Sequence, residues 1–560
     1  MNVRKHIEFS DLSCEESEGI TRARLSPPKA SGSRTRIMTL VSLSPSIPDR
    51  LIGHGLAQWS QAQTEEPVLL VELGSVSSGV SLQEFGTVAP RLNGEFCFAE
   101  RLLDGEGGFK RLQVRMSGGP HEPDFVRPLL EHFGRHFPLV LLRIGPDVSD
   151  RVLFECVAHS ERTYLFIRQS QADLYDFDLL LREARSRFNG DCSRLKTVLC
   201  LNEGDRVRVP SELATKMGGL LHALIHDCPA ADERPTAKVF GADVRRLARE
   251  ISRCRVGLAL SAGGARGLAH VGVIQVLEEN GIEVDAVAGC SMGAYIGAVW
   301  GYGCDGQDME RIACELAGRW RVWRLVDPVF PPREGFIRGR AVGRRLQKTI
   351  GDSHFAELAR PVRVVATNLY TLDRVVFSSG EVASAVSASI AIPGVCAPIE
   401  IDGESYVDGA ITDPVPVDVL EEMGISRIIA VNTIPTPAYM RCCVEREREQ
   451  EALYGRRHVF LKALNRQLNY FAPGNILDIM MRAVHGAQIR VAEAACRRAD
   501  VVLRPLAMDG HWYEFDKAHK FIALGRRTAE EHLDQIKSLF NKRDKSYERE
   551  GVDKPLAGLA

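Results

Sequence analysis

The sequence lacks the features that mark several large classes of protein. Its formal net charge is −2, so no basic excess points to nucleic acid as a partner. The 14 cysteines are scattered without a C-x-x-C pair, and the charged start MNVRKHIEFSDLSCEESEG has no apolar core typical of a signal peptide. These absences predict a reduced, cytoplasmic setting, and they leave open a peripheral contact with the inner face of a membrane.

Two further absences concern metals and membrane spans. No group of Asp, Glu, His or Cys has the short spacing of a metal site, so the sequence predicts no metal and no cofactor. The uncharged stretch 286–304 is long enough to cross a membrane, but glycines punctuate it at four-residue spacing. Such glycines also let a helix pack closely in a protein interior, and we therefore predict a buried segment.

What is present is enough apolar sequence for more than one domain. A chain of 560 residues, 45% of them hydrophobic, is too long to fold around a single hydrophobic core of ordinary size. Polar composition predicts disordered tails at 1–35 and 541–560. The stretch 236–255 is basic and amphipathic, and it is expected to form a solvated linker helix, or alternatively a helix on anionic lipid. Two folded domains, 36–235 and 256–540, remain.

The first domain is expected to be α/β and Rossmann-like. Continuous apolar runs separated by helix-length spacers are typical of a parallel sheet covered on both faces. These runs lie at 37–43, 68–73, 137–144, 162–168 and 196–202.

The turn after the first of these runs lacks the chemistry of a phosphate site. It reads SPSIPDR (44–50), with neither glycine nor lysine. Pro45 and Pro48 remove two N–H donors, and Asp49 would repel phosphate. The layout resembles the deviant-Walker partitioning ATPases in topology alone. We expect a degenerate scaffold or regulatory domain that does not bind nucleotide, and a nucleotide-binding regulatory protein remains the alternative.

Two strand–turn–helix segments open the second domain. The first, VGLALSAGGARGLAHVGVIQVLEENGI (256–282), contains Gly263 and Gly264, which let backbone N–H groups point outward at a helix N-terminus. Such a turn stabilises an anion, either a phosphate or the oxyanion of an acyl-transfer intermediate. The second segment, 284–301, contains G-x-S-x-G at Gly289, Ser291 and Gly293, the pattern of a nucleophile elbow. Cys290 is a poor alternative nucleophile because Ser291 holds the exposed elbow position.

A nucleophilic serine needs a base, and the sequence offers a carboxylate in a better position than any late histidine. Asp408 follows a short strand in ESYVDGAITDPVPVDVL (404–420) and precedes a glycine turn. His270, on the helix after the glycine loop, is the alternative base, although we expect it to be buried and hydrogen-bonded. The late histidines stand among polar helical residues: His458, His485, His511, His519 and His532.

Together, the glycine loop, G-x-S-x-G and a later D-G-A resemble the patatin-like phospholipases, and most closely the bacterial relatives of neuropathy target esterase. The resemblance covers 256–432 well and continues thinly into 499–533; the Rossmann-like part also resembles the region that precedes the hydrolase in those proteins. It implies a three-layer α/β catalytic domain that uses a Ser–Asp dyad without histidine.

Carried over by position, the resemblance makes Ser291 the nucleophile and Asp408 the general base. The backbone N–H groups of Gly263, Gly264 and Ala265 would form the oxyanion hole, and Arg266 would steady that loop. The chain departs from the family pattern at Ala262, where the family has a third glycine.

The function expected from this resemblance is hydrolysis of phospholipid or lysophospholipid esters, whereas the residues alone indicate only an acyl ester. Ser387 and Ser389 are expected to be small packing residues on a helix near the active site. The alternative to an active enzyme is a catalytically weak pseudoenzyme that senses lipid.

Overall fold

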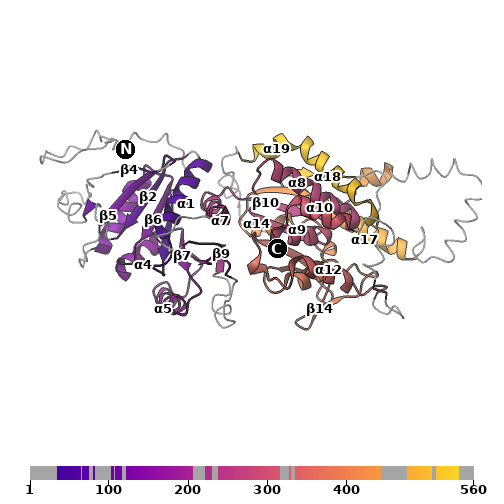
Figure 1. Cartoon of the computed structure of the whole chain (residues 1–560), viewed down its shortest axis with the longest axis horizontal. Helices are drawn as coiled ribbons and strands as arrows, with labels where there is room; N and C mark the ends of the chain where they lie inside the picture. Colours follow the sequence, from indigo (N-terminus) through magenta and orange to yellow (C-terminus); the bar gives the residue numbers. More distant parts are fainter. Residues whose placement is uncertain are drawn as a thin grey trace, which may run out of the picture. The chain divides into compact units, whose positions relative to one another are not determined.

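The structure is a computed structural model that describes residues 35–64, 66–74, 80–81, 102–105, 107–115, 122–205, 221–229, 238–315, 327–328, 335–442, 445, 476–506 and 513–540. The chain forms two compact units that divide between Cys254 and Arg255, coloured indigo to purple and rose to yellow in Figure 1. The expected disordered tails, 1–35 and 541–560, lie outside the described residues apart from Thr35.

The first unit is built on one sheet, with nine strands among the described residues. Its strands are β1 (Arg36–Ser42), β2 (Val68–Leu73), β3 (Val80–Ser81), β4 (Leu103–Asp104), β5 (Lys110–Arg115), β6 (Leu139–Ile144), β7 (Arg162–Ile167), β8 (Leu195–Cys200) and β9 (Leu221–Ile225). They lie in the order β3-β5-β2-β6-β1-β7-β8-β9, parallel throughout, and β4 pairs antiparallel with β5. The predicted parallel sheet is confirmed.

Helices cover both faces of this sheet, because successive strand residues such as Leu70 and Val71 are buried on opposite sides. On one face lie α1 (Asp49–Thr64) and α7 (Lys238–Ile251), and on the other α3 (Val126–Gly134), α4 (Asp150–His159) and α5 (Gln171–Arg187), with the short 3-10 helix η1 (Glu122–Phe125) before α3. This three-layer arrangement is the α/β architecture expected from the apolar runs.

Helix α7 occupies the stretch expected to be a solvated linker, and that expectation is wrong for its inner face. Phe240, Val244 and Ile251 lie in the apolar core beside α1. The helix therefore belongs to the first unit. Its amphipathic pattern is explained by burial of the apolar face against the sheet, not by exposure of both faces to water.

The turn after β1 is held by the unit's own side chains. Arg168, at the end of β7, donates from Nε to Ser46 Oγ (3.1 Å), from Nη2 to the Ser46 carbonyl (3.1 Å) and to the Pro229 carbonyl (3.0 Å). Asp49 begins α1 and accepts from Arg143 Nε at 3.0 Å. A guanidinium and an ion pair thus occupy the region in which the sequence lacks phosphate-binding residues.

The second unit has a mixed sheet with eight strands among the described residues, in the order β14-β15-β12-β11-β10-β16-β17, with β13 also paired to β12. Strands β10, β11, β12, β16 and β17 are parallel, whereas β13, β14 and β15 add antiparallel pairs. The bounds are β10 (Val256–Leu260), β11 (Ala286–Cys290), β12 (Val362–Asn368), β13 (Arg374–Phe377), β14 (Ile399–Ile401), β15 (Glu404–Asp408), β16 (Arg427–Val431) and β17 (Val501–Leu503).

Helices again cover both faces, and separate apolar clusters fill the two interfaces. The larger cluster joins the sheet to α8 (Ala269–Glu279), α9 (Met292–Tyr302), α10 (Gly306–Cys314), α12 (Arg340–Ile350), α13 (Val382–Ser389), α18 (Ala518–Glu531) and α19 (Leu533–Ser538). The smaller one joins it to α14 (Val417–Glu422) and α17 (Ile476–Cys496). The 3-10 turns are η2 (Gly264–Leu268), η4 (Phe355–Glu357), η5 (Gly409–Ile411) and η6 (Phe515–Lys517).

The uncharged stretch 286–304 is buried, as predicted from its glycines. It divides into strand β11 and helix α9, and Trp300 in the helix is only 2% exposed. In the part of the chain that the structure describes, we find no helix with both the length and the apolar character needed to cross a bilayer.

Candidate active site

Ser291 lies in a sharp turn between strand β11 and helix α9. Its φ is +53°, a left-handed conformation that non-glycine residues rarely adopt without a functional reason. A Cβ at Gly289 would lie 2.5 Å from the Gly293 carbonyl oxygen, and one at Gly293 would lie 2.2 Å from the Leu260 carbonyl oxygen. Only glycine fits at both flanking positions, which is the geometry of a nucleophile elbow.

Asp408 reaches Ser291 through the sheet register. Strand β12 pairs with β11, Cys290 opposite Val365, and with β15, Asp408 opposite Ala366. Asp408 and Cys290, the residue before Ser291, therefore lie opposite neighbouring residues of β12. Although Ser291 and Asp408 are 117 residues apart in sequence, Ser291 Oγ donates a hydrogen bond to Asp408 Oδ2 at 2.7 Å.

The Asp408 carboxyl is buried, at 4% exposure, and no cation lies beside it among the described residues. Burial raises its pKa to about 6 against the lowering effect of its hydrogen bonds from Ser291, the Ala410 backbone N–H and the Cys290 thiol. Its Oδ1 accepts from Ala410 N at 2.8 Å. A carboxylate with a pKa close to neutral is matched to taking and returning a proton.

Ser389 holds the elbow, a role that we did not predict from the sequence. It ends helix α13; its Oγ accepts from Ser291 N at 2.8 Å and donates to the Val365 carbonyl at 2.6 Å. The predicted position near the active site is confirmed, but the hydroxyl does more than pack. The run VSASIAIPG contained a weak indication of this role, because a hydroxyl on a helix of small residues can be buried and must then find hydrogen-bond partners.

The glycine loop forms η2 beside the elbow, and Gly264 and Ser291 line the same cavity. A Cβ at Gly263 would lie 2.1 Å from Thr433 Oγ1, so this position requires glycine. In the described structure, the backbone N–H groups of Gly263, Gly264 and Ala265 donate to no other residue. The departure at Ala262 is accommodated, because this residue is buried and donates to the Pro414 carbonyl at 3.0 Å.

Three other residues singled out from the sequence are accounted for by their surroundings. Arg266 is buried, and its Nη2 lies 3.4 Å from His485 Nε2 on α17, which fits a residue that steadies the loop. His270 is fully buried and donates from Nε2 to the Ser261 carbonyl at 2.9 Å, so that nitrogen faces the loop backbone. Burial lowers the pKa of His270 to about 4. Cys290 is buried too, and burial together with the Asp408 charge raises its pKa well above its ordinary value.

An apolar cavity of about 190 Å³ opens from Ser291 between helices α9, α10 and α12. Its lining is almost entirely hydrocarbon, with Ser291 and the glycine loop at one end. Representative lining residues are Leu268, Ile296, Val299, Met309, Ala313, Val342, Ile390 and Phe515. A cavity of this kind suits an acyl chain better than a polar group.

A second, larger cavity of about 1270 Å³ shares Ser387, Ala397 and Ile399 with the first. Arg338, Arg340 and Arg344 line it and are exposed, and within the described residues none of the three forms an ion pair. We did not predict a functional role for these three arginines from the sequence, because an arginine-rich start of a helix is usually a solvated surface.

Both Ser291 and Asp408 lie within the part of the chain that matches a known protein family. Residues 258–421 match the family model of patatin-like phospholipases. A lysophospholipase nte1 of Aspergillus fumigatus is 37% identical over 194 residues, which cover 34% of this chain and 13% of the relative. An NTE family protein of Mycobacterium bovis is 39% identical over 184 residues, which cover 33% of this chain and 50% of the relative.

The second unit therefore contains a patatin-like phospholipase domain, of the kind found in NTE family proteins. The chain aligns with half of the mycobacterial relative and a smaller part of the fungal one. Among solved structures, a ParA family ATPase from Chlorobium tepidum is similar at 12% identity and a TM-score of 0.28, over 39% of this chain and 92% of that chain.

Proposed function

We propose that the second unit is a serine acyl-ester hydrolase that uses Ser291 as nucleophile and Asp408 as the only general base. The observation that carries this proposal is the 2.7 Å bond from Ser291 Oγ to Asp408 Oδ2 at the end of an apolar cavity. His270 does not serve as the base in this proposal, because Ser291 Oγ donates to Asp408, whereas the hydrogen bond that His270 makes goes from Nε2 to the Ser261 carbonyl.

The reaction proceeds in two halves. Asp408 takes the proton of Ser291 while Oγ attacks the ester carbonyl, and the N–H groups of the glycine loop receive the negative charge that develops on the carbonyl oxygen. Asp408 returns its proton to the leaving alcohol, which leaves an acyl-enzyme. Water then gives a proton to Asp408 and attacks the acyl carbon, and the fatty acid departs as Ser291 regains its proton.

For the substrate we propose a phospholipid or lysophospholipid, because the matching family model describes phospholipases and the fungal relative is named a lysophospholipase. The arrangement of the two cavities supports this choice. The hydrocarbon lining beside Ser291 suits the acyl chain, and the three arginines of the larger, adjoining cavity suit a phosphate, which guanidinium groups bind well.

Covalent labelling tests the nucleophile and separates an active enzyme from a lipid-sensing pseudoenzyme. A fluorophosphonate probe should label the wild-type protein on Ser291, and Ser291→Ala should remove both labelling and esterase turnover. Ser378→Ala, an exposed serine outside the cavities, is the matched control and should label normally. Labelling that persists in Ser291→Ala would disprove the assignment.

The arginine cavity is tested with two substrates. Arg344→Gln should raise KM for a lysophospholipid by about tenfold, since a charge-assisted hydrogen bond contributes about 1.5–3 kcal/mol, and should leave kcat/KM for a p-nitrophenyl ester within about twofold. Arg527→Gln, which removes an exposed i,i+4 pair with Glu531, is the control and should change neither. Equal losses on both substrates would count against a phosphate site.

A further inference from the structure

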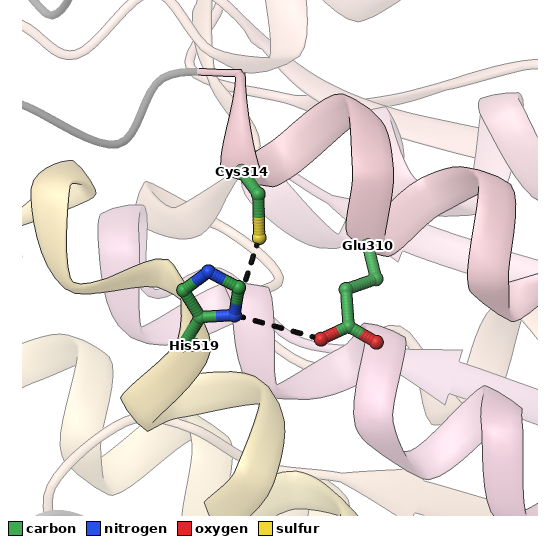
Figure 2. A group of neighbouring side chains, drawn as sticks. All are labelled: Glu310, Cys314 and His519. Atoms are coloured by element: carbon green, nitrogen blue, oxygen red, sulfur yellow. Dashed lines mark hydrogen bonds and ion pairs between the residues drawn. The ribbon is translucent and has the colours of Figure 1, made fainter.

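Three potential metal ligands from distant parts of the second unit converge at its surface. Glu310 and Cys314 lie one turn apart on α10, and His519 is the second residue of α18 (Figure 2). His519 Nδ1 lies 3.4 Å from Cys314 Sγ and 3.6 Å from Glu310 Oε1, and the three donor atoms lie within 4.8 Å of one another. Local spacing predicted no metal site because His519 is 205 residues from Cys314.

The geometry differs from that of a catalytic relay. In a Cys–His–carboxylate triad, the thiol and the carboxylate bond to opposite nitrogens of the imidazole. Here the same nitrogen, Nδ1, lies close to both the sulfur and the carboxylate oxygen, so the three donor atoms form one cluster.

The separations match those of metal ligands. Tetrahedral zinc with Zn–S of about 2.3 Å and Zn–N or Zn–O of about 2.0–2.1 Å places sulfur and nitrogen about 3.5–3.6 Å apart and nitrogen and oxygen about 3.3–3.4 Å apart. The observed distances from His519 Nδ1, 3.4 Å to sulfur and 3.6 Å to oxygen, lie within about 0.3 Å of these values.

Neighbouring residues hold the ligands in position. Gln275 is buried on α8, and its Nε2 donates to Glu310 Oε2 at 2.7 Å and to the Gly306 carbonyl at 3.1 Å. This leaves Oε1 of Glu310 directed at His519. A partner that orients a ligating carboxylate is typical of built metal sites.

Helix α18 is seated tightly on α8, which fixes where His519 stands. A Cβ at Gly272 would lie 2.0 Å from the Ile522 carbonyl oxygen, and one at Gly525 would lie 1.9 Å from the Ala269 carbonyl oxygen. The two backbones therefore approach more closely than any side chain would permit.

We propose that Glu310, Cys314 and His519 bind a zinc-class divalent metal ion, with water in the fourth position. Thiolate, imidazole and carboxylate together favour zinc over calcium or magnesium, which prefer oxygen ligands alone. The Cys314 thiol must lose its proton to bind the ion, so affinity should fall as pH falls.

The ion would join two walls of the apolar cavity. Met309 and Ala313 on α10 line that cavity, as does Phe515 in η6, four residues before His519. A metal ion bound to both segments would therefore hold α10 and the start of α18 together beside Ser291.

Cobalt absorption tests the site without any reference to hydrolysis. Full-length protein, reduced and freed of metal by a chelator, is titrated with Co²⁺. Wild type should develop a thiolate-to-cobalt charge-transfer band with one equivalent, and Zn²⁺ should abolish it by displacement. Cys314→Ser should lose the band, whereas Cys442→Ser, which removes an exposed cysteine outside the cluster, should keep it.

Two further variants compare how much a proposed ligand and the residue that orients Glu310 contribute to metal affinity. His519→Gln should weaken Zn²⁺ binding more than Gln275→Leu, for which loss of an orienting partner should cost about 10–100-fold. Zn²⁺ should raise Tm in wild type and Cys442→Ser but not in His519→Gln. A wild-type protein without the band, or a band that survives in Cys314→Ser, would overturn the proposal.

Discussion

Each unit contains a buried carboxylate on a strand of its sheet, and the two have opposite properties. Glu72 on β2 is fully buried, and burial alone would raise its pKa. The hydrogen bond from Gln113, the nearby His54 and the guanidinium groups of Arg111 and Arg143 instead lower it to about 2. Asp408 on β15 has hydrogen bonds but no adjacent cation among the described residues, and burial raises its pKa to about 6.

This difference in surroundings explains why Asp408, and not Glu72, suits the proposed role of a base. Glu72 is surrounded by cations, with Arg111 Nε at 3.0 Å and Arg143 Nη1 at 3.4 Å, so it stays charged and is suited to structure. Asp408 faces a hydroxyl, a thiol and one backbone N–H, so its charge is only weakly stabilised and a proton can come and go.

The turns after the first strand of each unit differ in the same way. Residues 44–49 contain two prolines and are held by Arg168, whereas 261–268 contain three glycines, of which Gly264 lines the cavity beside Ser291. Both units are parallel α/β sheets at this point, so the chemistry depends on the turn residues and not on the architecture.

The largest effect that would sharpen this comparison is on catalysis. Asp408→Asn should lower kcat/KM on a soluble ester by about 10⁴, the upper end for loss of a general base. The free energy of unfolding at pH 7–8 should not fall. The pKa of Asp408 in the folded protein, about 6, exceeds the ordinary 3.8. Ionisation of Asp408 therefore lowers the stability of the wild-type protein progressively between about pH 4 and pH 6, and by a constant amount above pH 6.

Cys290→Ala is the matched control, because Cys290 is equally buried and also contacts Asp408. It should retain activity within about tenfold, the range of one weak hydrogen bond. Near-normal activity in a folded Asp408→Asn protein would show that Asp408 is not the base, and it would favour a histidine in that role.

The next largest effect is on stability. Glu72→Gln should lower the free energy of unfolding of the first unit by about 1–3 kcal/mol, because it removes the charge that pairs with Arg111, whereas Arg143 keeps its pair with Asp49. Activity per folded molecule should not change. Glu183→Gln, which breaks an exposed pair with Arg187, should cost less than about 1 kcal/mol. Urea denaturation measures both, and a Glu72→Gln protein as stable as wild type would contradict a structural role.

The pH dependence of hydrolysis gives a smaller effect. Because Asp408 acts as a carboxylate, kcat/KM should be level at neutral pH and fall about tenfold per unit below pH 6, following its pKa of about 6. A pH profile on a substrate without ionisable groups measures this limb. An acid limb near pH 4, the ordinary range of an aspartate, would mean that burial does not tune this carboxylate.

The smallest effect expected is that of nucleotide on the first unit. Millimolar Mg²⁺–ATP should shift Tm by less than about 1 °C, since stabilisation by a ligand requires concentrations above its Kd. ATP hydrolysis should stay at background. A saturable shift that is lost on deletion of residues 36–235 would restore the nucleotide-binding alternative.

The sequence by itself determined the elements that depend on local backbone geometry. The apolar runs predicted the parallel sheet of the first unit, and the glycines of the two strand–turn–helix segments predicted the loop at Gly263 and the elbow at Ser291. Short-range steric rules suffice there, because the residues that would clash with a side chain are close in sequence or belong to the next strand. The prediction of a solvated linker over 236–255 was wrong, because the amphipathic pattern of a helix does not reveal what the apolar face of that helix contacts.

Only the tertiary structure decided which distant groups meet. The register of β12 joins Ser291 to Asp408, and the close packing of α18 on α8 brings His519 to Glu310 and Cys314. Likewise, the guanidinium groups around Glu72, and their absence around Asp408 in the part of the chain that the structure describes, set one pKa near 2 and the other near 6. Electrostatic environment and metal geometry depend on distances of a few ångströms between residues hundreds of positions apart, which no local pattern encodes.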